Sequence, residues 1–215
     1  MTTRSVGRLD DALTAAGARF SGTVAVDFGS VGGEVAAATR GVGIAVADGV
    51  RTTEWRGAET ALREALDDAG VAPPSPGRGV RHDGRWWCPV SRERLLVVDL
   101  AAGRPAPAAP TQVSSIDLSD DYATLLVLGP RAAPLLARSG HLDEPLAVGA
   151  LSVRTGEPRA TVLRVAEARY VVQVATARAG DLWSRLVACG QADGVAAVGR
   201  DAQRLLVVAD ARGGR

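Results

Sequence analysis

The sequence predicts an α+β fold made of two duplicated β-β-α-β units with antiparallel sheets. The first observation is a repeat, in which Ile44 precedes Gly57 and Ile116 precedes Gly129 by the same 13 residues. The copies start 72 residues apart, longer than the roughly 20 to 50 residues of solenoid repeats, which indicates a duplicated unit. The second observation is that no long strand–helix alternation with a Gly-rich phosphate loop is present, which argues against a parallel sheet.

Three elements are expected before the first copy. Asp10–Ala18 predicts a short helix, with Gly17 near its end. Thr23–Phe28 alternates apolar and polar residues as a half-buried strand does. Gly33–Arg40 is rich in alanine, the best helix former, and predicts a helix that stops at Gly41.

The first copy continues into a helix, a loop and a hairpin. Ala58–Ala69 places its apolar residues on one helical face, and Gly70 suits the position after its end. Residues 71–79 (VAPPSPGRG) carry too many Pro and Gly residues for a helix or a central strand, so we expect a loop. Arg85–Val90 and Arg94–Leu100 flank a three-residue turn and predict a hairpin.

A second Pro-rich stretch, Gly103–Thr111, is the expected boundary between two lobes. We therefore predict a first lobe over residues 1–110 and a second over residues 111–215.

The second copy begins with an apolar strand, Tyr122–Leu128, and a helix entered at Gly129-Pro130. Thr176 is the expected cap of a helix that ends at Gly190. The apolar run Leu205–Ala209 fits a helix or a strand equally well. The strands expected between these helices are Leu151–Arg154, Ala160–Val165 and Tyr170–Ala175, with a turn at Glu167–Arg169.

Composition excludes several classes of function. The net charge of +1 gives no electrostatic footprint for nucleic acid or for anionic lipid. No stretch approaches 18 apolar residues, and the N-terminus lacks the apolar core of a signal peptide, so we expect a cytoplasmic protein without a membrane span. Cys88 and Cys189 form no CxxC motif, which predicts two reduced thiols and no metal site, and His141 is expected at the surface.

Several stretches, taken together and in order, resemble the folate-binding module of the aminomethyltransferase (glycine-cleavage T-protein) superfamily, which includes the sarcosine oxidase gamma subunit. T-proteins are longer and end in an extra small barrel domain, so the resemblance implies a truncated, gamma-subunit-like module that lacks the barrel. The matching text is Asp27-Phe28-Gly29-Ser30 with Glu34, GVGI at 41–44, Gly79–Asp83, LLVVD at 95–99, residues 117–136, Ala166–Tyr170, Leu182–Leu186 and Gly194–Gly199.

The resemblance implies tetrahydrofolate as cofactor and assigns roles to five residues. Asp83 matches an acid that lies beside the folate nitrogens and is the candidate catalytic residue, while His82 replaces the acid before it. Glu167 matches a glutamate that would accept two parallel hydrogen bonds from the pterin edge, with Tyr170 at the family spacing. Phe28 stands where the family has Tyr and keeps the ring without the hydroxyl.

Ordinary structural roles explain the same residues. A solvated His-Asp pair in a loop accounts for residues 82 and 83, and a plain hairpin glutamate accounts for residue 167. Val46 stands where the family's first strand has Asp, and Val207 and Ala209 stand where it has Arg and Glu. These departures weigh against transfer chemistry.

Three functions stay open at this point. The first is a folate-binding aminomethyltransferase-like protein of glycine or sarcosine one-carbon metabolism, which needs Asp83 and Glu167 to line one cavity. The second is a non-catalytic gamma-type subunit that packs against larger flavoprotein subunits and carries a broad apolar surface patch. The third is a degenerate module without folate chemistry. Whether the protein is an enzyme is undecided; an active one would transfer a one-carbon unit to tetrahydrofolate.

Overall fold

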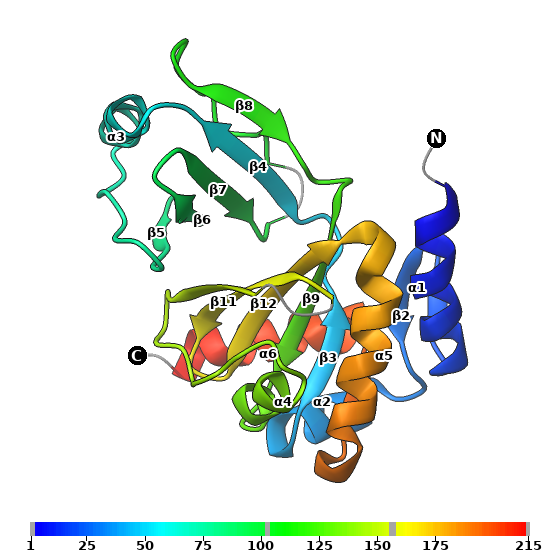
Figure 1. Ribbon diagram of the computed structural model, residues 1–215. Helices are drawn as coiled ribbons and strands as arrows, with labels where there is room; N and C mark the ends of the chain where they lie inside the picture. Colours follow the sequence, from blue (N-terminus) through cyan, green and yellow to red (C-terminus); the bar gives the residue numbers. More distant parts are fainter. Residues whose placement is uncertain (1–2, 102–103, 155–157, 214–215) are drawn as a thin grey trace.

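Three sheets and six α-helices make up the described part of the chain, which in this computed structural model comprises residues 3–101, 104–154 and 158–213 (Figure 1). The α-helices are α1 (Thr3–Ala15), α2 (Val31–Arg40), α3 (Glu59–Asp68), α4 (Ala132–Arg138), α5 (Ala179–Gly190) and α6 (Arg200–Gly213). Short 3₁₀ turns, Thr176–Arg178 and Gln191–Asp193, flank α5.

The two large sheets have the same strand order. The five-stranded sheet runs β5 (Val80–His82), β6 (Arg85–Ser91), β7 (Arg94–Asp99), β4 (Arg51–Arg56), β8 (Ser114–Asp117). The six-stranded sheet runs β10 (Leu151–Arg154), β11 (Ala160–Ala166), β12 (Arg169–Ala175), β9 (Tyr122–Leu128), β3 (Gly43–Val46), β13 (Ala196–Val198). A separate hairpin joins β1 (Arg19–Ser21) to β2 (Val24–Asp27). The predicted α+β class with antiparallel sheets is confirmed, with β13 added in parallel to β3.

Each copy of the repeat gives its first strand to the sheet of the other copy. The strand β3 pairs with β9, so that Ile44 lies opposite Val127, and β8 pairs with β4, so that Ile116 lies opposite Glu54. The two sheets therefore exchange strands across the Pro-rich linker, and neither sheet is made from one half of the sequence alone. The division into lobes at residue 110 stays a prediction.

The central strands of both large sheets are apolar on both faces, so each sheet is covered by other elements on both sides. In β9, Leu125 and Val127 face α1, α4 and α5, whereas Leu126 and Leu128 face α2, α6 and the five-stranded sheet. In β7, Leu96 and Val98 face the six-stranded sheet, whereas Leu95 and Val97 face α3. The five-stranded sheet is thus stacked between α3 and the rest of the molecule (Figure 1).

Two further contacts tie the sheets together away from the exchanged strands. The backbone N–H of Gly79 donates to Gly149 at 2.7 Å, and that of Leu151 donates to Gly77 at 2.8 Å. Between the sheets, the Gln173 amide donates to the Thr52 hydroxyl at 2.6 Å and to the Thr124 hydroxyl at 3.4 Å, all three side chains being buried.

Most predicted elements are confirmed, with differences at the end of α1 and at His141. The helix α1 ends at Ala15, earlier than predicted, because the chain turns at Gly17 with φ of 87°. The run Leu205–Ala209, left open between helix and strand, lies within α6. The surface position predicted for His141 is wrong: the residue is 2% exposed, and its ring nitrogens are hydrogen-bonded to the Ser139 hydroxyl at 2.9 Å and to the Pro158 carbonyl at 3.3 Å.

The matching glycines of the two copies predict unequal costs of substitution. A Cβ at Gly129 would lie 2.1 Å from the Ala38 carbonyl oxygen, and its φ of 103° is left-handed. A Cβ at Gly57 would meet nothing closer than the Gln112 oxygen at 3.3 Å. We expect Gly129→Ala to lower the unfolding free energy by about 3 kcal/mol or more, or to prevent folding, and Gly57→Ala by about 1 kcal/mol or less in urea titrations. Equal losses would contradict this packing.

Candidate functional site

Asp83, the predicted catalytic residue, lies at the tip of the β5–β6 hairpin. Its φ of 46° is left-handed, as hairpin turns require, and Gly84 follows with φ of 74°. The carboxylate accepts hydrogen bonds from Arg104 and, at 3.4 Å, from Arg85, and the Arg104 guanidinium also donates to the Asp83 carbonyl at 2.6 Å. Because 65% of its side chain is exposed, Asp83 fastens the linker to the hairpin at the surface.

His82, the neighbour of Asp83 in β5, is half-buried against the end of α3. Its ring atoms lie 3.8 and 3.9 Å from the position that a Cβ at Gly70 would take. Its ring therefore packs beside the turn at the end of α3.

Glu167 and Tyr170 lie at the β11–β12 turn but serve different parts of the structure. Glu167 is exposed, and its backbone carbonyl accepts a hydrogen bond from Arg164 Nε at 3.1 Å. Tyr170 is 1% exposed and packs in the core formed with α1, α4 and α5, on the face of the sheet turned away from the five-stranded sheet. Burial raises the pKa of Tyr170, and the Arg164 guanidinium, 5.6 Å from the ring centroid, opposes that rise.

Phe28 follows β2 and packs against α5. Its ring stacks on Trp183 with centroids 6.3 Å apart and planes inclined by 17°. The five predicted site residues thus lie at the β5–β6 hairpin, at the β11–β12 turn and beside α5, and no hydrogen bond or ion pair among the described residues joins these three places.

A small cavity lies between the two sheets. It has a volume of about 10 Å³ and is lined by residues of both sheets, among them Cys88, Leu96, Val171 and Gln173. One water molecule needs roughly 10 to 15 Å³, so the cavity is far too small for a pterin. Burial raises the pKa of the Cys88 thiol to about 12, which keeps it protonated and unreactive at neutral pH.

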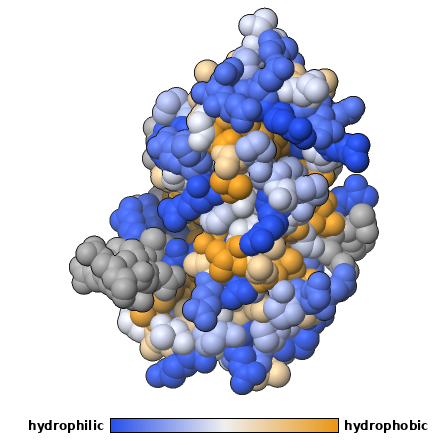
Figure 2. Space-filling model, turned by 90° about the vertical axis from the view of Figure 1, so that its left-hand side faces the viewer, coloured by the Kyte–Doolittle hydropathy of each residue, from blue (hydrophilic) through white to orange (hydrophobic). Residues whose placement is uncertain are grey.

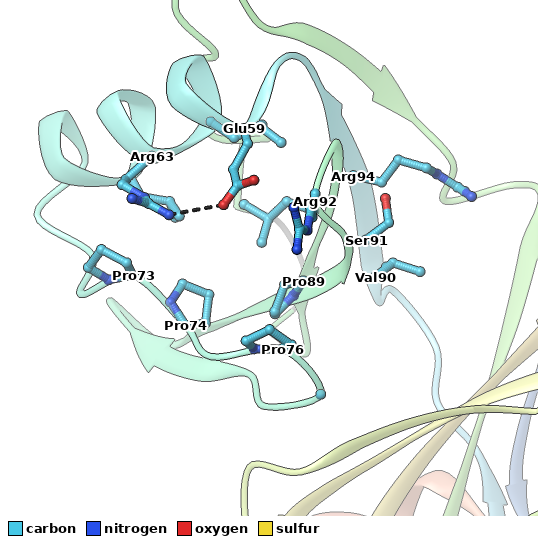
Figure 3. Close-up of a pocket in the computed structure, with 14 residues that line it drawn as sticks. Glu59, Arg63, Pro73, Pro74, Pro76, Pro89, Val90, Ser91, Arg92 and Arg94 are labelled. Carbon is cyan, nitrogen blue, oxygen red and sulfur yellow. Dashed lines mark hydrogen bonds and ion pairs between the residues drawn. The ribbon is translucent and has the colours of Figure 1, made fainter.

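Two larger hollows lie elsewhere. A groove of about 460 Å³ runs between α3, the loop 71–79 and the β6–β7 hairpin (Figure 3), and a shallower hollow is lined by Arg56, Gly57, Ala58, Glu93 and Arg94. Neither of these, nor the cavity between the sheets, has Asp83 or Glu167 in its lining. The predicted folate residues and the space between the sheets, as arranged here, do not fit a bound pterin.

The carboxylates of Asp27 and Glu34 accept hydrogen bonds from backbone N–H groups. Glu34 is 6% exposed; its carboxylate accepts from the N–H of Phe28 at 2.7 Å and of Gly199 at 2.8 Å. Gly199 approaches β2 so closely that a Cβ would lie 2.4 Å from the Asp27 Cα. Residues 27–34 and Gly199, which are far apart in sequence, are therefore in direct contact. We call this contact the joint.

The described residues contain no helix long and apolar enough to cross a membrane. Within the same described ranges, no three or more His, Cys, Asp or Glu side chains gather where they could hold a metal ion.

With its two sheets of matching strand order, this chain has the fold of the folate-binding T-protein module. It is similar to the glycine cleavage system aminomethyltransferase T from Bartonella henselae, with a TM-score of 0.70 and 18% identity over 93% of this chain. The match spans 60% of the aminomethyltransferase chain.

A chain of the heterotetrameric sarcosine oxidase from Corynebacterium sp. U-96 is also similar, with a TM-score of 0.58 and 16% identity over 79% of this chain and 95% of that chain. No protein-family model and no curated protein matches the chain by sequence. At these identities the likeness is one of fold.

The joint predicts a specific dependence of stability on pH. Hydrogen bonds from Arg19 Nε at 2.6 Å and from the Gly29 N–H at 2.8 Å lower the pKa of Asp27 below its usual 3.8. A carboxylate with a lowered folded-state pKa stabilises the fold above the unfolded-state pKa, and that contribution is lost as the pH falls through the folded-state value. We expect wild-type protein to exceed Asp27→Asn in unfolding free energy at pH 6, and the difference to shrink below about pH 4.

The matched control is Asp68→Asn, at an exposed acid of α3 without a described ion pair. Its difference from wild type should stay nearly constant over the same pH range. A gap for Asp27→Asn that is as large at pH 3 as at pH 6, measured by urea unfolding, would contradict the assigned contacts.

Proposed function

We propose that this protein is a T-protein-fold module that acts by binding a protein partner, as a non-catalytic subunit of a larger assembly, and does not transfer one-carbon units. The observation that carries the proposal is the packing between the sheets, where the cavity is about 10 Å³ and Asp83 and Glu167 are absent from its lining. The match to 95% of a chain of a heterotetrameric oxidase supports a subunit role.

The outer strand of the six-stranded sheet supports the same proposal. The strand β10 pairs along one side with β11, and on its other side the Leu151 N–H donates to the Gly77 carbonyl at the start of the strand. Edge strands can be covered by a partner, and the exposed part of this edge lies beyond that contact. Val148, just before β10, is 47% exposed and Val153, within it, is 46% exposed. Figure 2 shows apolar residues gathered in patches on the left-hand face of the molecule.

Tetrahydrofolate binding is the second candidate, favoured by the fold match to the aminomethyltransferase over 93% of this chain. It would require the two sheets to separate enough to admit a pterin, because the cavity between them is smaller than the ligand.

Calorimetric titration with tetrahydrofolate separates the two candidates. We expect no saturable heat and no thermal shift at millimolar ligand from protein that is folded by circular dichroism. A T-protein titrated alongside serves as the positive control. Saturable binding of one folate per chain, weakened by Asp83→Asn, would replace the subunit proposal with the folate proposal.

A charge on the β10 edge should block assembly without unfolding the chain. We expect co-expressed flavoprotein oxidase subunits to co-elute with wild-type protein and to be lost with Val153→Asp. Phe20→Asp, which alters a 37% exposed apolar residue in the separate β1–β2 hairpin, is the control and should still co-elute. Co-elution that survives Val153→Asp would rule out this edge as the contact.

A further inference from the structure

We propose that the groove on the outer face of the five-stranded sheet binds a small organic carboxylate with an apolar body. This inference goes beyond the proposed function, because the groove lies on the face of the sheet that carries α3, opposite the space between the sheets. Its volume of about 460 Å³ falls in the range of roughly 300 to 1,000 Å³ typical of small-molecule sites. Figure 3 shows the lining residues arranged around one open space.

The floor of the groove is part of the hydrophobic core. Leu62 and Leu66 of α3 and Leu95 of β7 line it and are 6%, 5% and 3% exposed. They also belong to the core cluster with Trp55 and Trp87, whose rings meet edge to face with centroids 5.2 Å apart. The floor is therefore fixed by packing, and the small part of these leucines that reaches the groove is apolar.

The wall opposite α3 is built from prolines, which resist collapse into the space. Pro73, Pro74 and Pro76 come from the loop and Pro89 from β6. Each ring fixes its own φ, so that little conformational entropy is lost on holding the wall in place. Both loop ends are tied down: the N–H of Val71 donates to Leu66 at 2.8 Å, and the Gly77 carbonyl accepts from Leu151 at 2.8 Å.

The charges around the groove favour an anion. Three arginines, Arg63, Arg92 and Arg94, and one acid, Glu59, contribute to the lining, and Figure 3 shows the Arg94 side chain directed away from the open space. Arg63 is paired with Glu59 at 3.0 Å, and Arg94 donates to the fully buried Glu54 at 2.5 Å. These two arginines are therefore held in place by protein carboxylates.

Arg92 differs from the other two because it makes no ion pair with any described residue. Figure 3 shows it extending from the β6–β7 hairpin into the space between Glu59 and Pro89. A guanidinium offers two parallel N–H groups to a carboxylate. With the apolar floor beneath it, Arg92 is placed to hold the headgroup of an alkyl or aryl carboxylate whose body lies on Leu62, Leu66 and Leu95.

The test is an NMR titration of the ¹⁵N-labelled full chain with octanoate, with octylammonium and octanol as matched probes. We expect saturable shifts confined to α3, the loop 71–79 and residues 89–95, and octanoate to bind about tenfold more tightly than either other probe. Arg92→Ala should weaken octanoate about tenfold. Arg81→Ala, at an exposed arginine of β5 outside the lining, should leave the affinity unchanged.

Three results would overturn the proposal: no saturable shifts with millimolar octanoate, equal binding of all three probes, or octanoate binding that Arg92→Ala leaves unaltered. Because Arg92 is exposed at a hairpin tip, its replacement should leave the amide spectrum otherwise that of the folded chain. Asp83, Glu167 and Val153 are absent from the lining of the groove, so Arg92→Ala tests this proposal separately from folate binding and from assembly through β10.

Discussion

The strand exchange between the two copies is the constraint on which the rest of the structure depends. Because β3 completes the sheet that contains β9 and β8 completes the sheet that contains β4, each half of the sequence is an open sheet without the other. The exchange also fixes how the sheets face each other. The contacts at Gly79 and Gly149 fasten their opposite edges, and Gln173 and Thr52 join them in between.

Held together by these contacts, the two sheets leave a cavity of about 10 Å³ between them. A pterin does not fit in that space, so the fold alone does not imply a folate site between the sheets. Trp86, Cys88 and Leu96 fill the interval from one side and Leu163 and Val171 from the other. The acids that the resemblance singles out lie in turns at the surface, and Tyr170 faces a different core. The described contacts of Asp83, Glu167 and Tyr170 are thus with neighbouring parts of the fold.

The local elements could be predicted from sequence because their signals are local. Gly41 ends α2 and the Pro-rich run makes a loop whatever lies beyond them. The exchange could not be predicted, because the residue patterns of short strands such as β3 and β8 do not specify which copy they pair with. His141 was misplaced for a similar reason: its partner carbonyl at Pro158 is distant in sequence and leaves no local trace. The groove was also missed, although the prolines of 71–79 were a signal that a rigid wall was present.

The exchange of first strands is the arrangement expected of a domain-swapped dimer whose two chains have been joined. Two separate chains of one β-β-α-β-β-β unit, each lending its first strand to the other, would form a closed two-fold dimer of the kind that domain swapping produces. Joining those chains end to end yields the present order of strands without breaking a pairing. In such an arrangement the Pro-rich stretch around residue 105 would be the connection between the two former chains, and Gly57 and Gly129, equivalent in the two copies, now stand in surroundings of different tightness.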